Sequence, residues 1–237
     1  MLQRLDKLIA SQGTQSRSEV TRLIRRGQVM VNDVICRDPS AKVDDETSVI
    51  LVGGKPLVYQ QYVYIMLNKP AGILCVSRDP RVSTVVDLLP PDLRRKNLFP
   101  AGRLDKDTVG LVILTDDGDF AHRMLSPKKE VEKCYHVRLD GPLFQEHIDA
   151  FLNGITLADG TRCRPAKLQI LEDGDRPLAA ITITEGRYHQ VKRMFGVIDR
   201  GVDWLKRVSI GSLQLDEALD DGESRYMTDE ECRKAFE

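Results

Sequence analysis

Apolar residues at the start of the chain recur at helical spacing. The first group consists of Leu2, Leu5, Leu8 and Ile9. Gly13 ends that segment, and Ser16 with Glu19 three residues later has the form of a capping box for a second helix. Gly27 ends the second helix. The pattern therefore predicts two short helices, the first starting at Leu2.

The second predicted helix has two chemically different faces. Its apolar positions fall together on a helical wheel: Val20, Leu23 and Ile24. The opposite face carries three cations at i, i+3 and i+4: Arg22, Arg25 and Arg26. We expect one face to pack in a core and the other to stay in water. Most charged faces of this kind are only solvated surfaces, so the stripe alone does not establish a function.

A short hairpin and one further strand follow the two helices. The strand-forming runs are Val29–Val31, Val34–Cys36 and Val49–Val52. Asn32 begins the turn of the hairpin, and the run from Gly53 to Pro56 punctuates the chain with glycine and proline. We therefore expect a small domain over residues 1–58 and a larger one over residues 59–237.

The larger domain alternates strand-like runs with shorter helical patterns. The predicted strands are Tyr62–Leu67, Leu111–Leu114, Cys134–Leu139, Leu168–Leu171, Ala179–Thr184 and Leu205–Ile210. The predicted helices are Phe120–Leu125, Leu143–Asn153 and His189–Gly196. This alternation predicts the α+β class, with no internal repeat.

Composition limits the classes of protein that the chain can belong to. It has 237 residues, 41% of them hydrophobic and 30% charged, with a formal net charge of −1, which excludes a disordered chain and a polycation. The longest apolar run, Tyr62–Leu67, is far shorter than the ~20 residues that span a bilayer. The first residues lack the pattern of a secretory signal. We therefore expect a soluble, cytoplasmic protein.

The near-zero net charge hides a segregation of charges along the chain. Residues 1–30 carry six bases and two acids, whereas residues 216–237 carry nine acids and three bases. The acidic tail thus masks a positive balance in the remainder, which keeps a nucleic-acid partner possible. The five cysteines and four histidines show no metal-ligand spacing, so neither a metal site nor a disulfide framework is expected.

The segment Phe99–Gly118 is the sharpest in the sequence. A loop flanked by glycines carries Arg103 and Asp105 and leads into an apolar run. The simplest interpretation is a turn before a buried strand, because aspartate and glycine favour turns. An apolar run ending in acids is also typical of nucleotide hydrolases, but no phosphate-binding loop motif occurs in the chain, so we reject that class.

Several motifs together resemble the RNA pseudouridine synthases of the RsuA group. They are Asn68–Gly72, Gly102–Asp105 with Gly110-Leu111, the K-x-Y motif at Lys133 and Tyr135, and Glu185–Met194. The first 50 residues or so resemble the αL RNA-binding domain of the ribosomal-protein-S4 type. The resemblance implies a catalytic domain built on a mixed, largely antiparallel sheet flanked by helices.

The implied reaction breaks the glycosidic bond of a uridine, rotates the base and reattaches it through carbon. It needs no redox, phosphate or metal step, and hence no cofactor. The resemblance assigns Asp105 as the nucleophile, at C1′ of the ribose or C6 of the base. Tyr135 is assigned to stack under the target base and to take the C5 proton. Arg103 is assigned to fill the space that the extracted uridine leaves in the RNA.

A carboxylate in an enclosed site needs a fixed cation beside it to remain ionised. On the helix from His189, a packing face is formed by Val191, Met194 and Phe195, and an opposite cationic face by His189, Lys192 and Arg193. The resemblance places Lys192 as the partner of Asp105 inside a closed site, and Arg193 is given no such partner. The alternative for Lys192 is a solvated helix face.

The predicted partner is ribosomal RNA, bound by a monomer. The residues expected to bind it are Arg17, Arg22, Arg25, Arg26, Arg187, His189 and Arg193. The amino-acid sequence of Glu185–Met194 resembles that of the small-subunit branch of the family, which implies a uridine of 16S rRNA as the target. The alternatives are a large-subunit rRNA pseudouridine synthase and a non-catalytic RNA-binding ribosome-assembly factor. A nucleoside hydrolase would need a second acid with a role, and none stands out.

Overall fold

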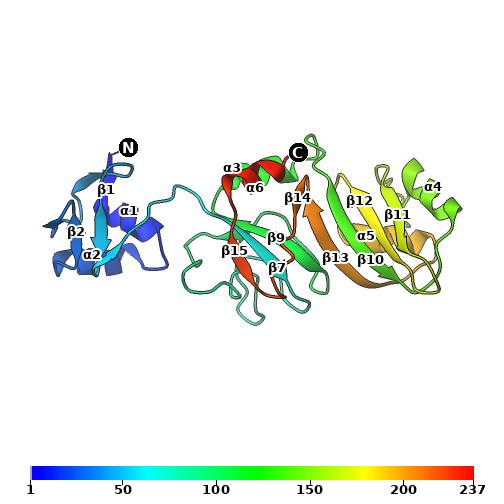
Figure 1. Ribbon diagram of the computed structural model, residues 1–237, viewed down its shortest axis with the longest axis horizontal. Helices are drawn as coiled ribbons and strands as arrows, with labels where there is room; N and C mark the ends of the chain where they lie inside the picture. The colour runs from blue at the N-terminus through cyan, green and yellow to red at the C-terminus, as the bar shows by residue number, and fades with distance from the viewer. Residues whose placement is uncertain (1) are drawn as a thin grey trace. The chain divides into compact units, whose positions relative to one another are not determined.

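A computed structural model describes residues 2–237 and divides the chain into two compact units (Figure 1). The first comprises Met1–Val63 together with Pro90–Leu98, and the second comprises Tyr64–Leu89 and Phe99–Glu237. The first unit thus extends beyond residue 58 and takes in a short segment from later in the chain. None of the helices within residues 2–237 is long and apolar enough to cross a membrane.

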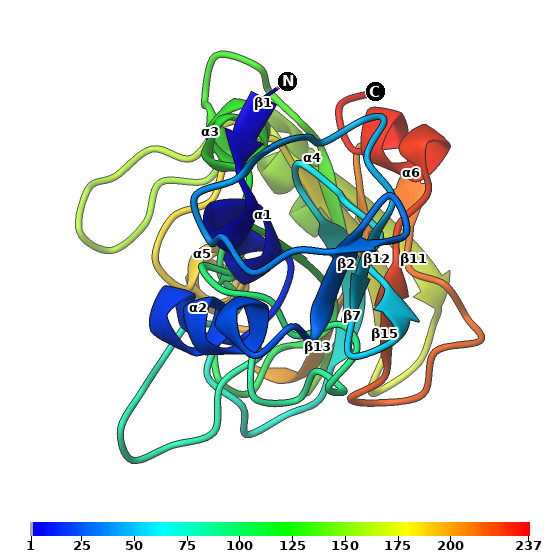
Figure 2. The ribbon, with the colours of Figure 1, turned by 90° about the vertical axis from the view of Figure 1, so that its left-hand side faces the viewer.

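The first unit combines two helices with short strands. Its elements are β1 (Leu2–Arg4), α1 (Leu5–Ser11), α2 (Arg17–Arg25), β2 (Val29–Val31), β3 (Val34–Ile35), β4 (Lys42–Asp44), β5 (Ile50–Val52) and β6 (Lys55–Pro56). Strands β1 and β4 pair with each other, and the remaining strands form a sheet in the order β3-β2-β5-β6. Figure 2 shows α1 and α2 next to each other, and their inner faces share one buried core with β2 and β5.

The capping box and the two faces of α2 are confirmed. The Ser16 hydroxyl accepts a hydrogen bond from the Glu19 amide, and the Glu19 carboxylate accepts one from the Ser16 amide. Val20 and Ile24 are fully buried, whereas the arginine stripe is exposed. The prediction that the first helix starts at Leu2 is wrong. The backbone of Leu2 pairs with β4 instead, and its side chain is 67% exposed.

A buried carboxylate ties α1 to α2. Asp6 is almost inaccessible to solvent and forms ion pairs with Arg4 at 2.9 Å and with Arg17 at 3.0 Å. The hydrogen bond from Arg4, followed by that from Arg17, holds the pKa of the Asp6 carboxyl well below its usual range. Arg17 therefore has a structural partner inside the first unit.

The second unit is built on a nine-stranded sheet with the main order β11-β12-β10-β13-β9-β7-β15. Its strands are β7 (Tyr64–Lys69), β8 (Phe99–Pro100), β9 (Val109–Thr115), β10 (Lys133–Leu139), β11 (Lys167–Glu172), β12 (Leu178–Ile183), β13 (Val202–Ile210), β14 (Leu213–Gln214) and β15 (Ser224–Tyr226). All neighbours pair antiparallel except β13 and β9, which are parallel. The α+β class with a mixed, largely antiparallel sheet is confirmed.

Four helices accompany the sheet: α3 (Gly118–Leu125), α4 (Gln145–Asn153), α5 (Gln190–Val197) and α6 (Asp229–Lys234). In Figure 1, α3 and α6 lie over the half that contains β7 and β9, and α4 and α5 accompany β11 and β12. Phe151 of α4 and Phe195 of α5 are both fully buried and pack with ring centroids 4.9 Å apart. Each half of the sheet therefore has its own helical cover.

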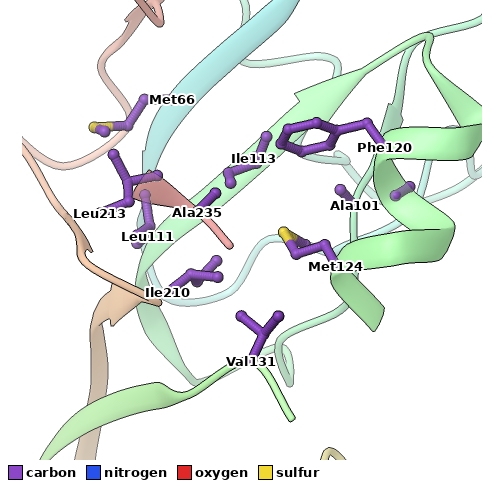
Figure 3. Close-up of a cluster of buried hydrophobic side chains, with 11 residues drawn as sticks. Met66, Ala101, Leu111, Ile113, Phe120, Met124, Val131, Ile210, Leu213 and Ala235 are labelled. Atoms are coloured by element: carbon purple, nitrogen blue, oxygen red, sulfur yellow. The ribbon is translucent and has the colours of Figure 1, made fainter. Parts of the chain in front are cut away.

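The core under α3 and α6 includes both ends of the second unit (Figure 3). Its buried residues are Met66, Ala101, Leu111, Ile113, Phe120, Ala121, Met124, Val131, Ile210, Leu213 and Ala235. The acidic segment 216–237, which the sequence analysis describes as a tail, forms β15 and α6. Ala235 is fully buried, and the Phe236 ring meets that of Phe120 edge to face. The acidic residues of this segment therefore belong to an integral part of the fold.

Candidate active site

The loop that carries Arg103 and Asp105 joins β8 to β9, in the middle of the sheet. Every residue of β9 is buried between β7 and β13, so the far end of the loop is anchored in the core. Gly110 has a φ of +98°, and a Cβ atom there would lie 2.3 Å from the carbonyl oxygen of Arg207. Only glycine permits this approach of β9 to β13, and it fixes where the loop ends.

Lys69 holds the same loop through hydrogen bonds to backbone carbonyl oxygens. Its side chain is fully buried, and Nζ donates hydrogen bonds to the carbonyl oxygens of Pro70, Lys106 and Thr108 at 3.1, 3.1 and 2.8 Å. Burial lowers the pKa of the Lys69 ammonium, and the three carbonyl dipoles compensate part of its lost hydration. Since Lys106 directly follows Asp105, this ammonium fixes the backbone beside the candidate nucleophile.

Two side chains from the α5 region lie against the Asp105 carboxylate. Nζ of Lys192 is 3.5 Å from Oδ2, and Nε2 of His189 is 3.5 Å from Oδ1. The structure thus brings together three of the residues that the sequence predicts for the site. The Asp105 and Lys192 side chains are 26% and 24% exposed, so the expectation of a closed, buried ion pair is wrong: this pair is open to solvent on one side.

Lys192 also has a second carboxylate partner. Its Nζ lies 2.5 Å from Oδ1 of Asp107, closer than to Asp105, and this hydrogen bond is the main cause of the lowered pKa of the Asp107 carboxyl. The Asp107 side chain is exposed. The two carboxylates therefore share one ammonium group, with Asp105 on the more enclosed side.

The turn before α5 is held by its own polar side chains. Glu185 accepts hydrogen bonds from the Arg164 amide, from Nε2 of Gln190 and from Nε of Arg187. Oε1 of Gln190 in turn accepts the amide of Arg187 at 2.9 Å. The predicted packing face is confirmed, because Val191, Met194 and Phe195 are all buried. These contacts fix the direction in which α5 presents its polar face.

Arg193, on the next position of that face, pairs with Asp159, whose Oδ2 lies 2.5 Å from NH2. The expectation that Arg193 has no carboxylate partner is therefore wrong. Hydrogen bonds from Thr161, followed by that from Arg193, lower the pKa of Asp159 to about 2. The ion pair joins α5 to the loop after α4 and does not involve the Asp105 carboxylate.

The remaining predicted catalytic residues are Arg103 on the loop itself and Tyr135 on β10, which β13 separates from β9 in the sheet. Tyr135 is buried on the same face of β10 as Lys133, and Arg103 is exposed on the loop. Within residues 2–237, neither side chain makes an ion pair or a hydrogen bond with Asp105. Lys133 donates from Nζ to the Val131 carbonyl oxygen, and burial lowers its pKa to about 8.

A comparison with known protein families identifies the family to which the chain belongs. The RNA pseudouridylate synthase family matches residues 63–196, which carry the whole Asp105 loop, Tyr135 and α5 up to Gly196. The chain belongs to this family. Its S4 domain matches residues 3–49, within the first unit.

Curated relatives of this pseudouridine synthase match it along nearly the whole chain. An uncharacterized RNA pseudouridine synthase, YtzG, of Bacillus subtilis is 45% identical over 229 residues, covering 96% of each chain. Ribosomal small subunit pseudouridine synthase A of Haemophilus influenzae is 40% identical and covers 98% of each chain. A solved pseudouridylate synthase is 40% identical with a TM-score of 0.68, over 98% of this chain and 99% of that one.

The S4 domain of the synthase carries the predicted RNA-binding arginines on α2. Arg22, Arg25 and Arg26 are exposed, and within the described part of the chain none of them forms an ion pair with a carboxylate. An open pocket of about 870 Å³ is lined by Arg4, Asp6, Arg17, Ser18, Thr21, Arg22 and Arg25. Arg4 and Arg17 of this set are paired with Asp6, whereas Arg22 and Arg25 present guanidinium groups that suit the phosphates of an RNA backbone.

Proposed function

We propose that this pseudouridine synthase converts one uridine of 16S rRNA to pseudouridine, with Asp105 as the nucleophile and no cofactor. The observation that carries the proposal is the placement of the Asp105 carboxylate between Lys192 and His189, on a loop held by a buried lysine. The small-subunit target is supported by the relatives named ribosomal small subunit pseudouridine synthase A.

The reaction is an isomerisation, so its atoms and electrons balance without a co-reactant. A carboxylate oxygen of Asp105 attacks C1′ of the ribose or C6 of the base, and the bond from C1′ to N1 breaks with its electron pair on the uracil. The base rotates and C5 forms the bond to C1′. The Asp105 oxygen leaves C1′ as that bond forms, or leaves C6 afterwards if the attack was on the base, so the carboxylate is regenerated. The proton on C5 is lost while N1 gains one. Lys192 at 3.5 Å compensates for water that the carboxylate loses when RNA covers it.

Tyr135 and Arg103 act on the two sides of the extracted nucleotide in this proposal. The buried ring of Tyr135 stacks under the target base and its phenol oxygen takes the C5 proton. The exposed guanidinium of Arg103 fills the space that the uridine leaves in the RNA stack, which offsets part of the few kcal/mol of unstacking.

Docking of the RNA is assigned to residues 1–58, and catalysis to residues 59–237. The phosphate-binding residues in this proposal are Arg17, Arg22, Arg25, Arg26, Arg187, His189 and Arg193. Arg17 remains in the set because its side chain is 54% exposed despite its pairing with Asp6. The protein acts as a monomer in the cytoplasm, where ribosomal subunits are assembled.

The decisive test maps pseudouridine in ribosomal RNA from cells with and without the gene. We expect one position of 16S rRNA to lose its pseudouridine, and the wild-type gene but not Asp105→Asn to restore it. Loss of a 23S rRNA position instead would identify a large-subunit synthase. An unchanged pattern in both RNAs would overturn the proposed activity and favour a non-catalytic assembly factor.

A further inference from the structure

Tyr188 projects an aromatic ring into solvent at the edge of the candidate active site. Its side chain is 76% exposed, more than any other aromatic residue among residues 2–237. Packing in a core therefore does not explain why an aromatic residue stands at this position. One face of the ring stacks on the ring of His189, with centroids 3.8 Å apart and an interplanar angle of 18°. The exposure leaves the other face of the tyrosine open.

The stacked pair is held in place by the turn before α5. His189 has φ +48° and ψ +35°, in the left-handed region that is unfavourable for a residue with a Cβ. The carbonyl oxygen of Tyr188 accepts a hydrogen bond from NH1 of Arg193, which Asp159 fixes in turn. The backbone of Tyr188 is therefore held by a contact that does not depend on its ring.

The pair continues directly from the reacting carboxylate. Nε2 of His189 lies 3.5 Å from Oδ1 of Asp105, and the Tyr188 ring is stacked on the face of the same imidazole. A single imidazole therefore links Tyr188 to Asp105, which keeps the tyrosine close to the nucleotides that flank a uridine placed at the carboxylate. Extracting a base from the stack leaves its neighbours with unpaired aromatic faces, which an aromatic side chain can cover.

We propose that the Tyr188 ring, backed by His189, is a stacking platform for the base of a nucleotide that flanks the target uridine. This inference rests on the proposed function, because it takes RNA at Asp105 as given. The ligand is a nucleobase of the substrate RNA, bound by its π face and without hydrogen bonds to its edges. The platform adds to the affinity for RNA and positions the RNA so that the target uridine lies at Asp105.

The test measures RNA binding in an Asp105→Asn background, in which no turnover intervenes, and turnover with Asp105 restored. We expect Tyr188→Ala to weaken binding about tenfold, a size typical of one base stacked on an aromatic ring, and Tyr188→Phe to stay within about twofold. Phe144→Ala is the matched control, because Phe144 is also exposed and its ring contacts that of His147 at the start of α4 and has no contact with Tyr188 or His189 among the described ring pairs.

Two substrate RNAs lacking the base on the 5′ or the 3′ side of the target uridine identify the stacking partner. On one of them the tenfold loss from Tyr188→Ala should disappear, because the base that the ring covers is already gone. An undiminished loss on both RNAs, equal losses from the Ala and Phe variants, or no loss from Tyr188→Ala would overturn the platform. Absence of pseudouridine from the wild-type reaction would instead overturn the proposed function.

Discussion

Two helices of this chain carry cations at i, i+3 and i+4, and they differ in what surrounds those cations. On α2 the stripe of Arg22, Arg25 and Arg26 is exposed and makes no ion pair within the described residues. At α5 the corresponding residues are His189, Lys192 and Arg193, and each lies within 3.5 Å of a carboxylate. The same spacing thus produces an open cationic face on α2 and a paired one on α5.

The difference decides what each face can do. An unpaired arginine in water can exchange its counterions for an RNA phosphate at little cost, which suits docking. A cation already paired with a carboxylate binds a phosphate only as that contact loosens, so it contributes less to docking and can instead fix its partner in place. We therefore assign α2 to backbone binding and Lys192 to the carboxylate of the reaction. Two predictions test this division, and a third tests the ion pairs that tie α2 to α1; they follow in order of decreasing effect.

Removing Lys192 should lower turnover far more than removing Arg193, although both changes delete one cation from the same face. We expect Lys192→Met to reduce the single-turnover rate on saturating RNA by about a hundredfold, because Asp105 loses its ammonium partner. Arg193→Met should cost less than about threefold, since its partner Asp159 is half exposed and such surface pairs contribute little. Tritium release from C5-labelled uridine measures both, and equal losses would mean that the assigned cation is wrong.

Replacing the three arginines of α2 together by glutamine should weaken RNA binding and flatten its dependence on salt. Each lost phosphate contact lowers the log–log slope by somewhat less than one, so we expect a decrease of about 2. Turnover on saturating RNA should stay near the wild-type value. Arg138→Gln is the control, because that arginine is paired with Glu172 on the surface of the second unit. An unchanged slope in the triple variant would exclude the α2 face from docking.

Asp6→Asn should destabilise the first unit in a way that depends on pH. Because the pKa of Asp6 is lowered in the fold, the ionised carboxylate stabilises the native state above the unfolded pKa of about 4, and this contribution is lost as the pH falls further. We expect the variant to lose about 1–3 kcal/mol of unfolding free energy at pH 7. The difference from wild type should shrink below pH 4 in urea unfolding of both proteins. A constant difference from pH 7 to pH 3 would show that charge is not the cause.

The helices and strands that the sequence predicts are those whose packing shows as a pattern among residues close together in the sequence. Strands such as β9 and β10 have long apolar or alternating patterns, and α2 has both a capping box and a two-faced wheel. The start of the first helix could not be predicted, because Leu2 fits the helical spacing by position alone. Its backbone pairs instead with Asp44, a contact between distant segments that periodicity does not encode.

The candidate site was predictable in its residue types and not in its pairings. The motifs place Asp105 and Lys192 in one site, and the structure brings them to 3.5 Å. The second partner of Lys192 and the partner of Arg193 come from loops whose approach depends on the whole sheet. Lys69 belongs to the Asn68–Gly72 motif, but its three contacts with carbonyl oxygens form only when the loop folds over its side chain. Such contacts follow from topology and leave no periodic signal.

The most direct test compares the two carboxylates that share Lys192, because the central claim gives the chemistry to only one of them. Asp105→Asn and Asp107→Asn each remove one charge from the same loop and change little volume. We predict that Asp105→Asn lowers tritium release from C5-labelled uridine RNA by at least about a thousandfold with nearly unchanged RNA affinity, whereas Asp107→Asn stays within about tenfold of wild type. Turnover of Asp105→Asn within tenfold of wild type, or an equal loss in both variants, would contradict the account.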